Sequence, residues 1–177
     1  MKELPDDSVL QGISLLLTDV DGVLTDGRIH FDGAGHELKT FHVHDGAGLV
    51  YWHRAGGLSG FLSGRRSQVV KERGEELGVH ELHLGRLDKR PVLEDILARR
   101  RLDATAVAYI GDDLADLPVL QIVGFAVTVP NARPEVLDHV HHVTGVPGGQ
   151  GAIREVVELL LKAQGKWNDV VRRGGLP

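Results

Sequence analysis

The sequence Ile13-Ser-Leu-Leu-Leu-Thr-Asp-Val-Asp-Gly-Val-Leu-Thr-Asp26 decides the fold of this chain. Its first five residues are an apolar run that predicts a buried strand. Asp19 and Asp21 follow this strand, and two carboxylates so close together disfavour each other's ionisation. A protein keeps such a pair where a cation or a reacting group needs both, and Gly22 lets the backbone turn sharply there. We therefore expect phosphoryl chemistry at the end of the strand, with Asp19 attacking and Asp21 transferring protons.

Beyond this strand, short apolar runs alternate with stretches of helical periodicity. Further strands are expected at residues 58–62, 81–84, 106–110 and 125–129, and helices at 48–55, 67–77, 89–101, 114–123 and 152–163. This alternation predicts an α/β fold, in which helices cover both faces of a doubly wound parallel sheet. We expect a single domain over residues 1–177, with a C-terminal tail over about 164–177 that is loose from residue 172.

Residues 28–43 depart from this alternation and predict a β-hairpin inserted after the first strand. Ile29 and Phe31 alternate with polar neighbours, and the sequence Asp32-Gly-Ala-Gly35 supplies a turn. Extended residues then resume from Leu38 to Val43. Two alternating runs around a glycine-containing turn are the usual signature of a hairpin.

Composition restricts the possible functions. The chain has 177 residues, of which 42% are hydrophobic, and this suits one domain with a sizeable core. A formal net charge of -5 argues against a dominant role in nucleic-acid binding. The absence of cysteine excludes disulfides and thiolate metal sites. The first residues lack the features of a signal peptide and no apolar stretch approaches the ~20 residues that cross a bilayer, so we expect a cytoplasmic protein.

Polar residues follow four of the predicted strands. Because the carboxyl ends of parallel strands meet at one edge of a sheet, we expect these residues to converge. They are Asp19 and Asp21, then Ser63-Gly64-Arg65, then Lys89, and finally Asp112-Asp113. Together they would supply a nucleophile, a hydroxyl, a fixed cation and metal-binding carboxylates, which is the set that phosphoryl transfer needs.

The predicted reaction is the hydrolysis of a phosphate monoester. Asp19 would form an aspartyl-phosphate, and Asp21 would protonate the leaving oxygen and later activate water. Ser63, Lys89 and the backbone N–H of Gly64 would bind the phosphate. A general acid alone supplies only about 10²–10⁴-fold of the acceleration that such a reaction requires, so these groups must act together.

The carboxylates at this edge also predict a Mg²⁺ site. The ion would be held by Asp19, Asp112 and a backbone carbonyl near Asp21, and water would complete its octahedron. Asp113 would serve as a further ligand or would orient water. Asp116, one helical turn further on, is either a partner behind these ligands or a surface acid.

Other functions use similar residues and stay open on this reading. Asp19 and Asp21 could cap a helix or bind Ca²⁺, although Val23 and Leu24 stand where an EF-hand needs a ligand and a glycine. A phospho-accepting receiver domain also uses an aspartate, an acidic pair, a hydroxyl and a lysine, but it has the acidic pair first along the chain. A scaffold without turnover is opposed by the acidic motifs, since unneeded buried carboxylates would only reduce stability.

The motifs resemble those of the haloacid dehalogenase superfamily of phosphotransferases. The first motif is Asp19-Val-Asp21-Gly-Val-Leu-Thr25, Ser63 and Lys89 match the second and third, and the fourth is Gly111-Asp-Asp-Leu-Ala-Asp116. The resemblance runs from about residue 13 to residue 164 and implies a Rossmann-like core. Only 44 positions separate Asp19 from Ser63, and 26 separate Ser63 from Lys89, which leaves no room for a separate cap domain.

Within the superfamily, the chain resembles a small capless branch that hydrolyses phosphorylated sugar acids such as 3-deoxy-D-manno-octulosonate 8-phosphate. The supporting segments are 19–27, 41–48, 63–65 and 148–155. This resemblance implies Mg²⁺ as the cofactor and a homotetramer in which the hairpin helps to cover a neighbour's site. It also implies that the glycine-rich segment 148–154 closes over the substrate, with no role for nucleic acid or membrane.

Contacts to the substrate are expected from Thr25, Arg65 and His44. His44 and Gln150 stand where members of the branch commonly carry arginine. Losing the paired hydrogen bonds between arginine and a carboxylate is not a conservative change. The substrate therefore stays open between 3-deoxy-D-manno-octulosonate 8-phosphate, a nine-carbon sialic-acid-type 9-phosphate and another small phosphate ester, with Arg65 or Arg66 as compensating residues.

Overall fold

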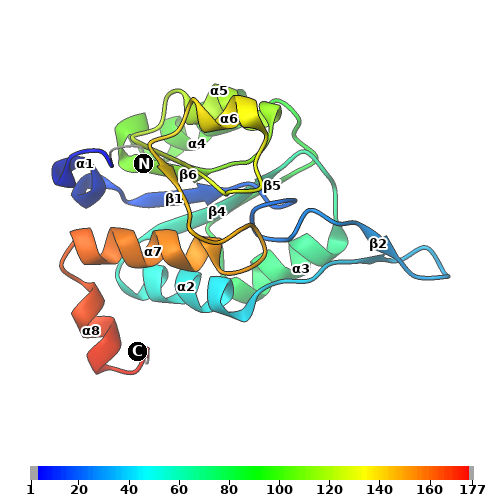
Figure 1. Ribbon diagram of the computed structural model, residues 1–177, viewed down its shortest axis with the longest axis horizontal. Coiled ribbons are helices and arrows are strands. Elements are labelled where there is room, and N and C mark those ends of the chain that lie inside the picture. Colours follow the sequence, from blue (N-terminus) through cyan, green and yellow to red (C-terminus); the bar gives the residue numbers. More distant parts are fainter. Residues whose placement is uncertain (1–3, 176–177) are drawn as a thin grey trace.

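The computed structural model describes residues 4–175 and centres on strand β1 (Leu15–Thr18). This strand lies between β4 (Leu58–Ser63) and β6 (Val107–Ile110) in a six-stranded sheet (Figure 1). The strand order is β5-β4-β1-β6-β7-β8, and all pairings within this sheet are parallel. The outer strands are β5 (Glu81–Leu84), β7 (Phe125–Thr128) and β8 (His142–Val143). The predicted doubly wound α/β sheet is therefore confirmed.

Helices cover both faces of the sheet because successive residues of each strand point to opposite sides. In β1, Leu16 packs in one layer, whereas Leu15 and Leu17 pack in the other. The layer of Leu16 contains α1 (Asp7–Gly12), α2 (Val43–Arg54), α3 (Gln68–Leu77) and α7 (Ala152–Ala163). The opposite layer contains α4 (Arg90–Arg100), α5 (Leu117–Leu120) and α6 (Pro134–Leu137).

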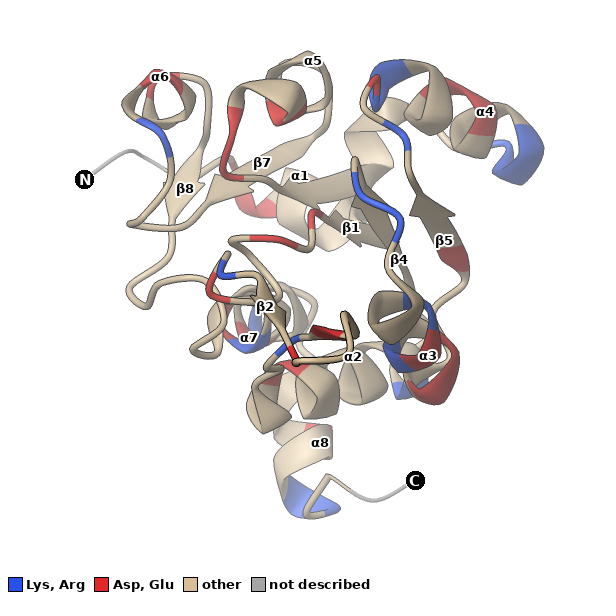
Figure 2. Cartoon of the chain, turned by 90° about the vertical axis from the view of Figure 1, so that its right-hand side faces the viewer, with Lys and Arg blue, Asp and Glu red and all other residues tan. Residues whose placement is uncertain are grey.

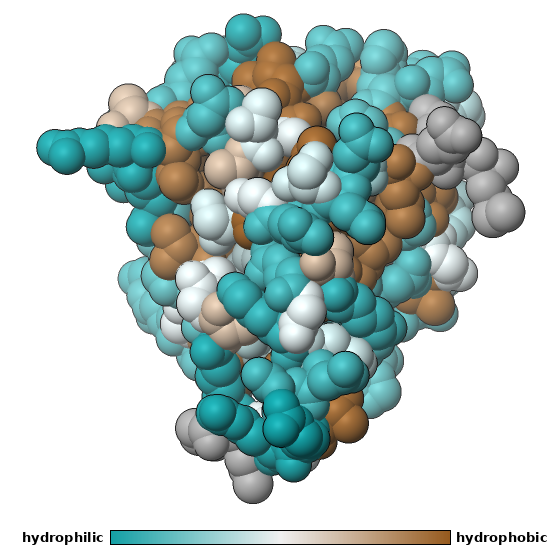
Figure 3. Space-filling view, turned by 90° about the vertical axis from the view of Figure 1, so that its left-hand side faces the viewer, coloured by the Kyte–Doolittle hydropathy of each residue, from teal (hydrophilic) through white to brown (hydrophobic). Residues whose placement is uncertain are grey.

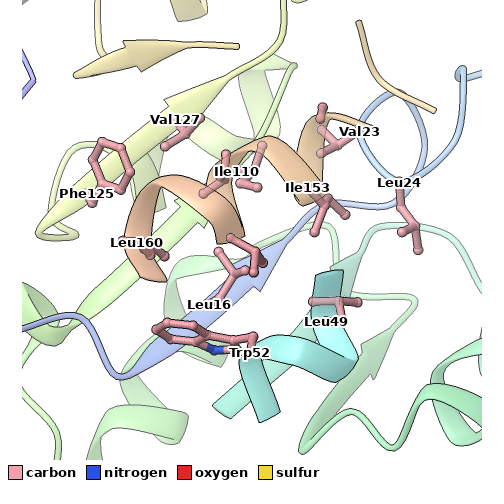
Figure 4. Packing of buried hydrophobic residues seen from close by; sticks show 14 of the residues in the cluster. Leu16, Val23, Leu24, Leu49, Trp52, Ile110, Phe125, Val127, Ile153 and Leu160 are labelled. Atoms are coloured by element: carbon pink, nitrogen blue, oxygen red, sulfur yellow. The ribbon is translucent and has the colours of Figure 1, made fainter. Parts of the chain in front are cut away.

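The core of the first layer also anchors the loop that follows β1. Figure 4 shows Leu16 of β1 among side chains of α2 and α7, including Trp52 and Leu160. Val23 and Leu24 belong to the same buried cluster, with exposed fractions of at most 1%. Burying one such side chain contributes about 1.5–3 kcal/mol. The loop that carries Asp21 is therefore held at both of its ends by apolar packing.

Helix α2 begins at Val43, five residues before the predicted start. His42 is its N-cap residue and accepts a hydrogen bond from the backbone of His44. Gly46 and Gly48 weaken the helical pattern in sequence, but both lie at tightly packed positions. A Cβ on Gly46 would lie 2.4 Å from Arg73 Nη2, and a Cβ on Gly48 would lie 3.1 Å from Arg154 Cα.

The helix predicted over residues 114–123 is instead divided. A 3₁₀ turn, η2 (Leu114–Asp116), precedes α5, in which Pro118 is near the N-terminus. Proline has no N–H to continue a preceding helix, which explains the break. Strand β8 and helices α1 and α6 were not predicted, because two to six residues are too few for a clear periodic signal.

The hairpin after the first strand is present but shorter than predicted. β2 (His30–Phe31) and β3 (Glu37–Leu38) form a separate antiparallel pair. The prediction that extended structure continues to Val43 is wrong, since Val43 opens α2. In Figure 1 the hairpin projects beyond the ends to which the strands of the main sheet point.

The C-terminal segment contains a helix where a tail was predicted. α8 (Trp167–Arg172) follows α7, and the guanidinium of Arg154 lies 5.2 Å from the ring centre of Trp167. Arg54 donates a hydrogen bond to the carbonyl of Gly175, and residues 176–177 lie outside the described part.

No helix among residues 4–175 is long and apolar enough to span a bilayer. Figure 3 shows hydrophobic residues interspersed with hydrophilic ones on the face opposite the carboxyl ends of the strands.

Candidate active site

The predicted polar clusters meet at the carboxyl edge of the sheet, which faces the viewer in Figure 2. Asp19 follows β1, Ser63 ends β4, Lys89 immediately precedes α4, and Asp112 follows β6. Because β1 pairs with both β4 and β6, Asp19 occupies the centre of this edge. The convergence expected from the topology is therefore observed.

Lys89 is the buried cation of the site. Its Nζ lies 2.5 Å from Asp19 Oδ1, 2.6 Å from Asp116 Oδ1 and 3.2 Å from the hydroxyl of Tyr109. The side chain is only 3% exposed. Burial alone would lower the pKa of Lys89, but Asp19 and Asp116 outweigh it and raise that pKa. The ammonium group is therefore retained at a fixed position beside Asp19.

Asp116 holds the loop that carries Asp112. Its Oδ1 accepts hydrogen bonds from Lys89 and from the hydroxyl of Tyr109. Its Oδ2 accepts from the backbone N–H groups of Asp112 and Asp113, at 2.9 and 3.1 Å. The residue is 1% exposed, so it is not a surface acid. Four donors occupy this carboxylate, and it therefore fits a positioning role better than direct metal binding.

Asp19 and Asp112 have the geometry to share a divalent cation. Oxygens of Asp19, Asp112 and Asp116 lie within 4.8 Å of one another. Among the described side chains, Asp112 Oδ1 is a buried oxygen without a hydrogen-bond partner. Burial and the neighbouring acids raise the pKa of Asp112 to about 7. Burial likewise raises that of Asp19 to about 6, with Lys89 opposing the shift. A hard cation such as Mg²⁺ would satisfy the unpartnered oxygen and neutralise the excess negative charge.

Two acids predicted at the metal are placed elsewhere. Asp113 is exposed and caps η2, where its Oδ1 accepts a hydrogen bond from the backbone N–H of Leu114. The carboxylate of Asp21 is not in the group formed by Asp19, Asp112 and Asp116. It instead forms an ion pair with Lys39. A backbone carbonyl near Asp21 therefore remains the better candidate from this segment.

Gly22 leaves the space that Asp112 fills. A Cβ on Gly22 would lie 2.0 Å from Asp112 Oδ2, and the φ angle of Gly22 is 109°. We expect Gly22→Ala to displace the Asp112 carboxylate and to reduce both Mg²⁺ affinity and phosphatase activity by at least about tenfold. Isothermal titration with Mg²⁺ measures the first effect directly. Gly33→Ala, where a Cβ would meet nothing within 4 Å, is the control and should bind Mg²⁺ normally.

Ser63 and Gly64 lie beside the loop that follows β5. Ser63 is 2% exposed, and its hydroxyl accepts a hydrogen bond from the backbone N–H of Arg65 at 3.1 Å. Its carbonyl accepts from the backbone N–H of Arg86 at 3.0 Å. A Cβ on Gly64 would lie 3.0 Å from Leu87 Cδ2. This turn is therefore fixed against the loop that leads to Lys89, and this position is compatible with the predicted phosphate site.

Thr25 and His44, both predicted to contact the substrate, have different surroundings. The hydroxyl of Thr25 donates to the carbonyl of Val20 at 3.3 Å and accepts from the backbone N–H of Gly27 at 3.2 Å. With 1% exposure, this threonine closes a turn, and its hydroxyl bonds within that turn. His44 is exposed on the first turn of α2, and its ring lies 5.0 Å from that of His42.

The glycine-rich segment before α7 packs against the loop after β1. The backbone N–H of Gly149 donates to the carbonyl of Val23 at 2.9 Å. Asp45, which is buried, accepts hydrogen bonds from the backbone N–H groups of Gly151 and Arg154 at 3.2 and 2.9 Å. Gln150 is exposed between these contacts. The segment is thus fixed near the site, and closure over a substrate remains a prediction.

Sequence reasoning missed three charged residues near the site. Asp45 holds the glycine-rich segment, and Glu37 and Lys39 bring the hairpin to Asp21. The alternation of Glu37 and Lys39 indicates that both point to one side of a strand. That signal could not show which side faces Asp21, because the path of the hairpin depends on tertiary packing.

The fold and the convergence of these side chains define a class of protein, the α/β enzymes that transfer phosphoryl groups at the carboxyl edge of a parallel sheet. Comparison with known proteins narrows this class. Residues 75–155 match the family of haloacid dehalogenase-like hydrolases. Over 163 residues, the chain is 42% identical to the 3-deoxy-D-manno-octulosonate 8-phosphate phosphatase of Yersinia pestis, covering 90% of this chain and 87% of that protein.

Solved structures agree with this relationship. The Moraxella catarrhalis phosphatase of the same name, in complex with magnesium, phosphate and 3-deoxy-D-manno-octulosonate (KDO), has a TM-score of 0.93 and 36% identity, over 95% of this chain and 97% of that one. A cobalt-bound phosphatase from Haemophilus influenzae has a TM-score of 0.89 and 39% identity, over 94% and 98% of the two chains. The chain belongs to the haloacid dehalogenase-like hydrolases, and the predicted family and enzyme class are confirmed.

Proposed function

We propose that this chain is a Mg²⁺-dependent phosphatase that hydrolyses 3-deoxy-D-manno-octulosonate 8-phosphate through an aspartyl-phosphate. The observation that carries the proposal is the position of Asp19. It lies next to the Lys89 ammonium and close to Asp112, whose buried Oδ1 has no hydrogen-bond partner. The similarity to phosphatases of this name extends over nearly the whole chain, which supports the same substrate.

In the proposed first step, an oxygen of Asp19 attacks phosphorus while the ester bond to the sugar breaks. Asp21 gives its proton to the leaving oxygen, so that the sugar departs as an alcohol. In the second step, Asp21 takes a proton from water, the water oxygen attacks the aspartyl-phosphate, and phosphate and free Asp19 result. Mg²⁺, held by Asp19 and Asp112, would neutralise charge on the phosphoryl oxygens.

The same proposal assigns phosphate binding to three residues. Lys89 holds its ammonium at the attacking carboxylate, and the turn of Ser63 and Gly64 is adjacent through the pairing of β1 with β4. Donors that are fixed before the reaction stabilise developing charge without reorganising. Arg65, whose side chain is 43% exposed and is paired with Glu37, is the proposed contact to the carboxylate of a sugar acid.

A nine-carbon sialic-acid-type 9-phosphate is the second candidate substrate. It stays a candidate because His44 and Gln150 are exposed and neither can form the paired hydrogen bonds of arginine, so the contacts to the sugar acid differ from those of the branch. The choice between these two sugar acids concerns only the part of the site that contacts the leaving alcohol. The phosphoryl chemistry proposed above is the same for both.

We also propose a homo-oligomer, with a tetramer as the expected form, working in the cytoplasm. The hairpin and the start of α2 carry exposed apolar side chains, which are Ile29, Phe31, Leu38 and Val43. A second copy of the chain that covers these side chains would also shield the site from water. Light scattering coupled to gel filtration should give the mass of four chains, and a monomer would refute this part.

The test of the proposed function is phosphate release by the purified chain from a panel of esters with Mg²⁺. The panel comprises both sugar-acid phosphates, ordinary sugar phosphates and nucleotides. We expect the eight-carbon sugar acid to have the highest kcat/KM and EDTA to abolish turnover until Mg²⁺ is returned. Failure to release phosphate from any ester would refute the proposal, and preference for the nine-carbon compound would establish the second candidate.

A further inference from the structure

Asp21 is contacted by a buried lysine that has no assigned role. The side chain of Lys39 is wholly buried, and its Nζ forms an ion pair with Asp21 Oδ1. The same Nζ lies 3.5 Å from Glu37 Oε1. Arg65 Nη2 lies 2.9 Å from that Glu37 oxygen, and Arg65 Nε lies 3.9 Å from Asp21 Oδ2. The acids Asp21 and Glu37 thus alternate with the cations Lys39 and Arg65 in one network.

This network joins three separate segments of the chain. Glu37 and Lys39 come from the hairpin, Asp21 from the loop after β1, and Arg65 from the loop after β4. The hairpin itself pairs only two residues on each side, and such a short ladder is marginal without further contacts. The ion pairs therefore hold the hairpin over the site as well as orienting Asp21.

A buried ammonium group is stable only with its partners, since removing a partner leaves an uncompensated charge. Lys39 reaches two carboxylates, whereas the carboxylate of Asp21 has no partners among the described residues besides Lys39 and Arg65. Arg65 is 43% exposed and lies at the longer distance, so it is the weaker of the two. Lys39 is therefore the main group that fixes the direction of the Asp21 carboxylate.

We propose that Lys39 is a positioning residue for proton transfer, holding Asp21 so that its carboxyl proton reaches the leaving oxygen as the ester bond breaks. The proposal rests on the phosphatase function proposed above and deepens it. A leaving alcohol departs with the proton from Asp21, whereas a leaving group that is stable as an anion departs without one. Loss of Lys39 should therefore matter only for esters whose leaving group needs protonation.

The test compares kcat/KM for a sugar phosphate and for p-nitrophenyl phosphate in the wild-type chain and in Lys39→Met. This parameter extends only to departure of the leaving group, so hydrolysis of the common aspartyl-phosphate does not affect it. We expect Lys39→Met to lower kcat/KM for the sugar phosphate by about 10–100-fold and for the aryl ester by less than about threefold. Lys39→Arg, which keeps a cation there, should recover much of the lost activity.

Lys71→Met removes a lysine of an exposed ion pair with Glu75 and should change neither substrate. If Lys39→Met does not fold, Glu37→Gln takes its place, because it removes the second negative charge beside Lys39. This variant should show the same difference between the two esters, with a smaller loss. Equal losses on both esters, or no loss, would overturn the role of Lys39. A wild-type chain that hydrolyses neither ester would instead refute the phosphatase function.

Discussion

Asp19→Asn is expected to abolish phosphatase activity, with a fall in kcat on the order of 10⁴–10⁶-fold. Asparagine has nearly the shape of aspartate, but its amide cannot form the aspartyl-phosphate. The carboxylate of Asp19 lies 2.5 Å from Lys89 and within the group that it forms with Asp112 and Asp116. Phosphate release and trapping of the labile phosphoenzyme by acid quench measure the two consequences.

The fold should survive this substitution, which separates a catalytic from a structural effect. Asp95→Asn, which removes an exposed acid paired with Arg99, is the matched control and should keep full activity. If Asp19→Asn retained more than about a tenth of the wild-type kcat, Asp19 would not be the nucleophile. Another carboxylate would then have to attack phosphorus.

The stability of the wild-type chain should depend on pH through Asp19, and Asp19→Asn should remove this dependence. Burial raises the pKa of Asp19 to about 6 from 3.8, so the folded chain binds this proton more tightly than the unfolded chain. The stability linked to this proton is complete below pH 3.8 and is lost as the pH rises through 6. Without Mg²⁺, the wild-type chain should therefore lose stability in this range relative to Asp19→Asn, as urea unfolding at several pH values would show.

The main features of the site could be predicted from sequence because topology fixes them. An apolar strand followed by Asp19, and a later strand followed by Asp112, must bring both acids to one edge once the strands are parallel. The burial of Lys89 was not foreseeable from its own neighbours in sequence. It follows from the two carboxylates that surround it in the folded chain.

The features that could not be predicted depend on contacts distant in sequence. The pairing of Lys39 with Asp21 requires the hairpin to fold back over the loop after β1, and a two-residue ladder gives no sign of that path. Thr25 illustrates the same limit, since its place in the first motif predicts a substrate contact but does not show that its hydroxyl bonds within its own turn. Local motifs therefore identify which residues gather, but not which of their atoms remain free.

Lys89→Met is expected to lower the free energy of unfolding by about 3–5 kcal/mol and to abolish activity. Methionine fills a similar volume, but it leaves the carboxylates of Asp19 and Asp116 buried without their common cation. Chemical denaturation measures the loss of stability. Lys162→Met, which removes an exposed partner of Glu158, is the control and should change the unfolding free energy by less than about 1 kcal/mol.

A second substitution distinguishes loss of the ion pair from loss of packing. Removing both members of a buried pair is far less destabilising than removing one, because no charge is left without a partner. Lys89 has two carboxylate partners, so combining Lys89→Met with Asp116→Asn leaves only Asp19 without a cation. The double variant should therefore recover part of the lost unfolding free energy while remaining inactive. If the double variant were as unstable as the sum of the two single variants, Lys89 would stabilise the chain through packing, and its charge would serve only the phosphate.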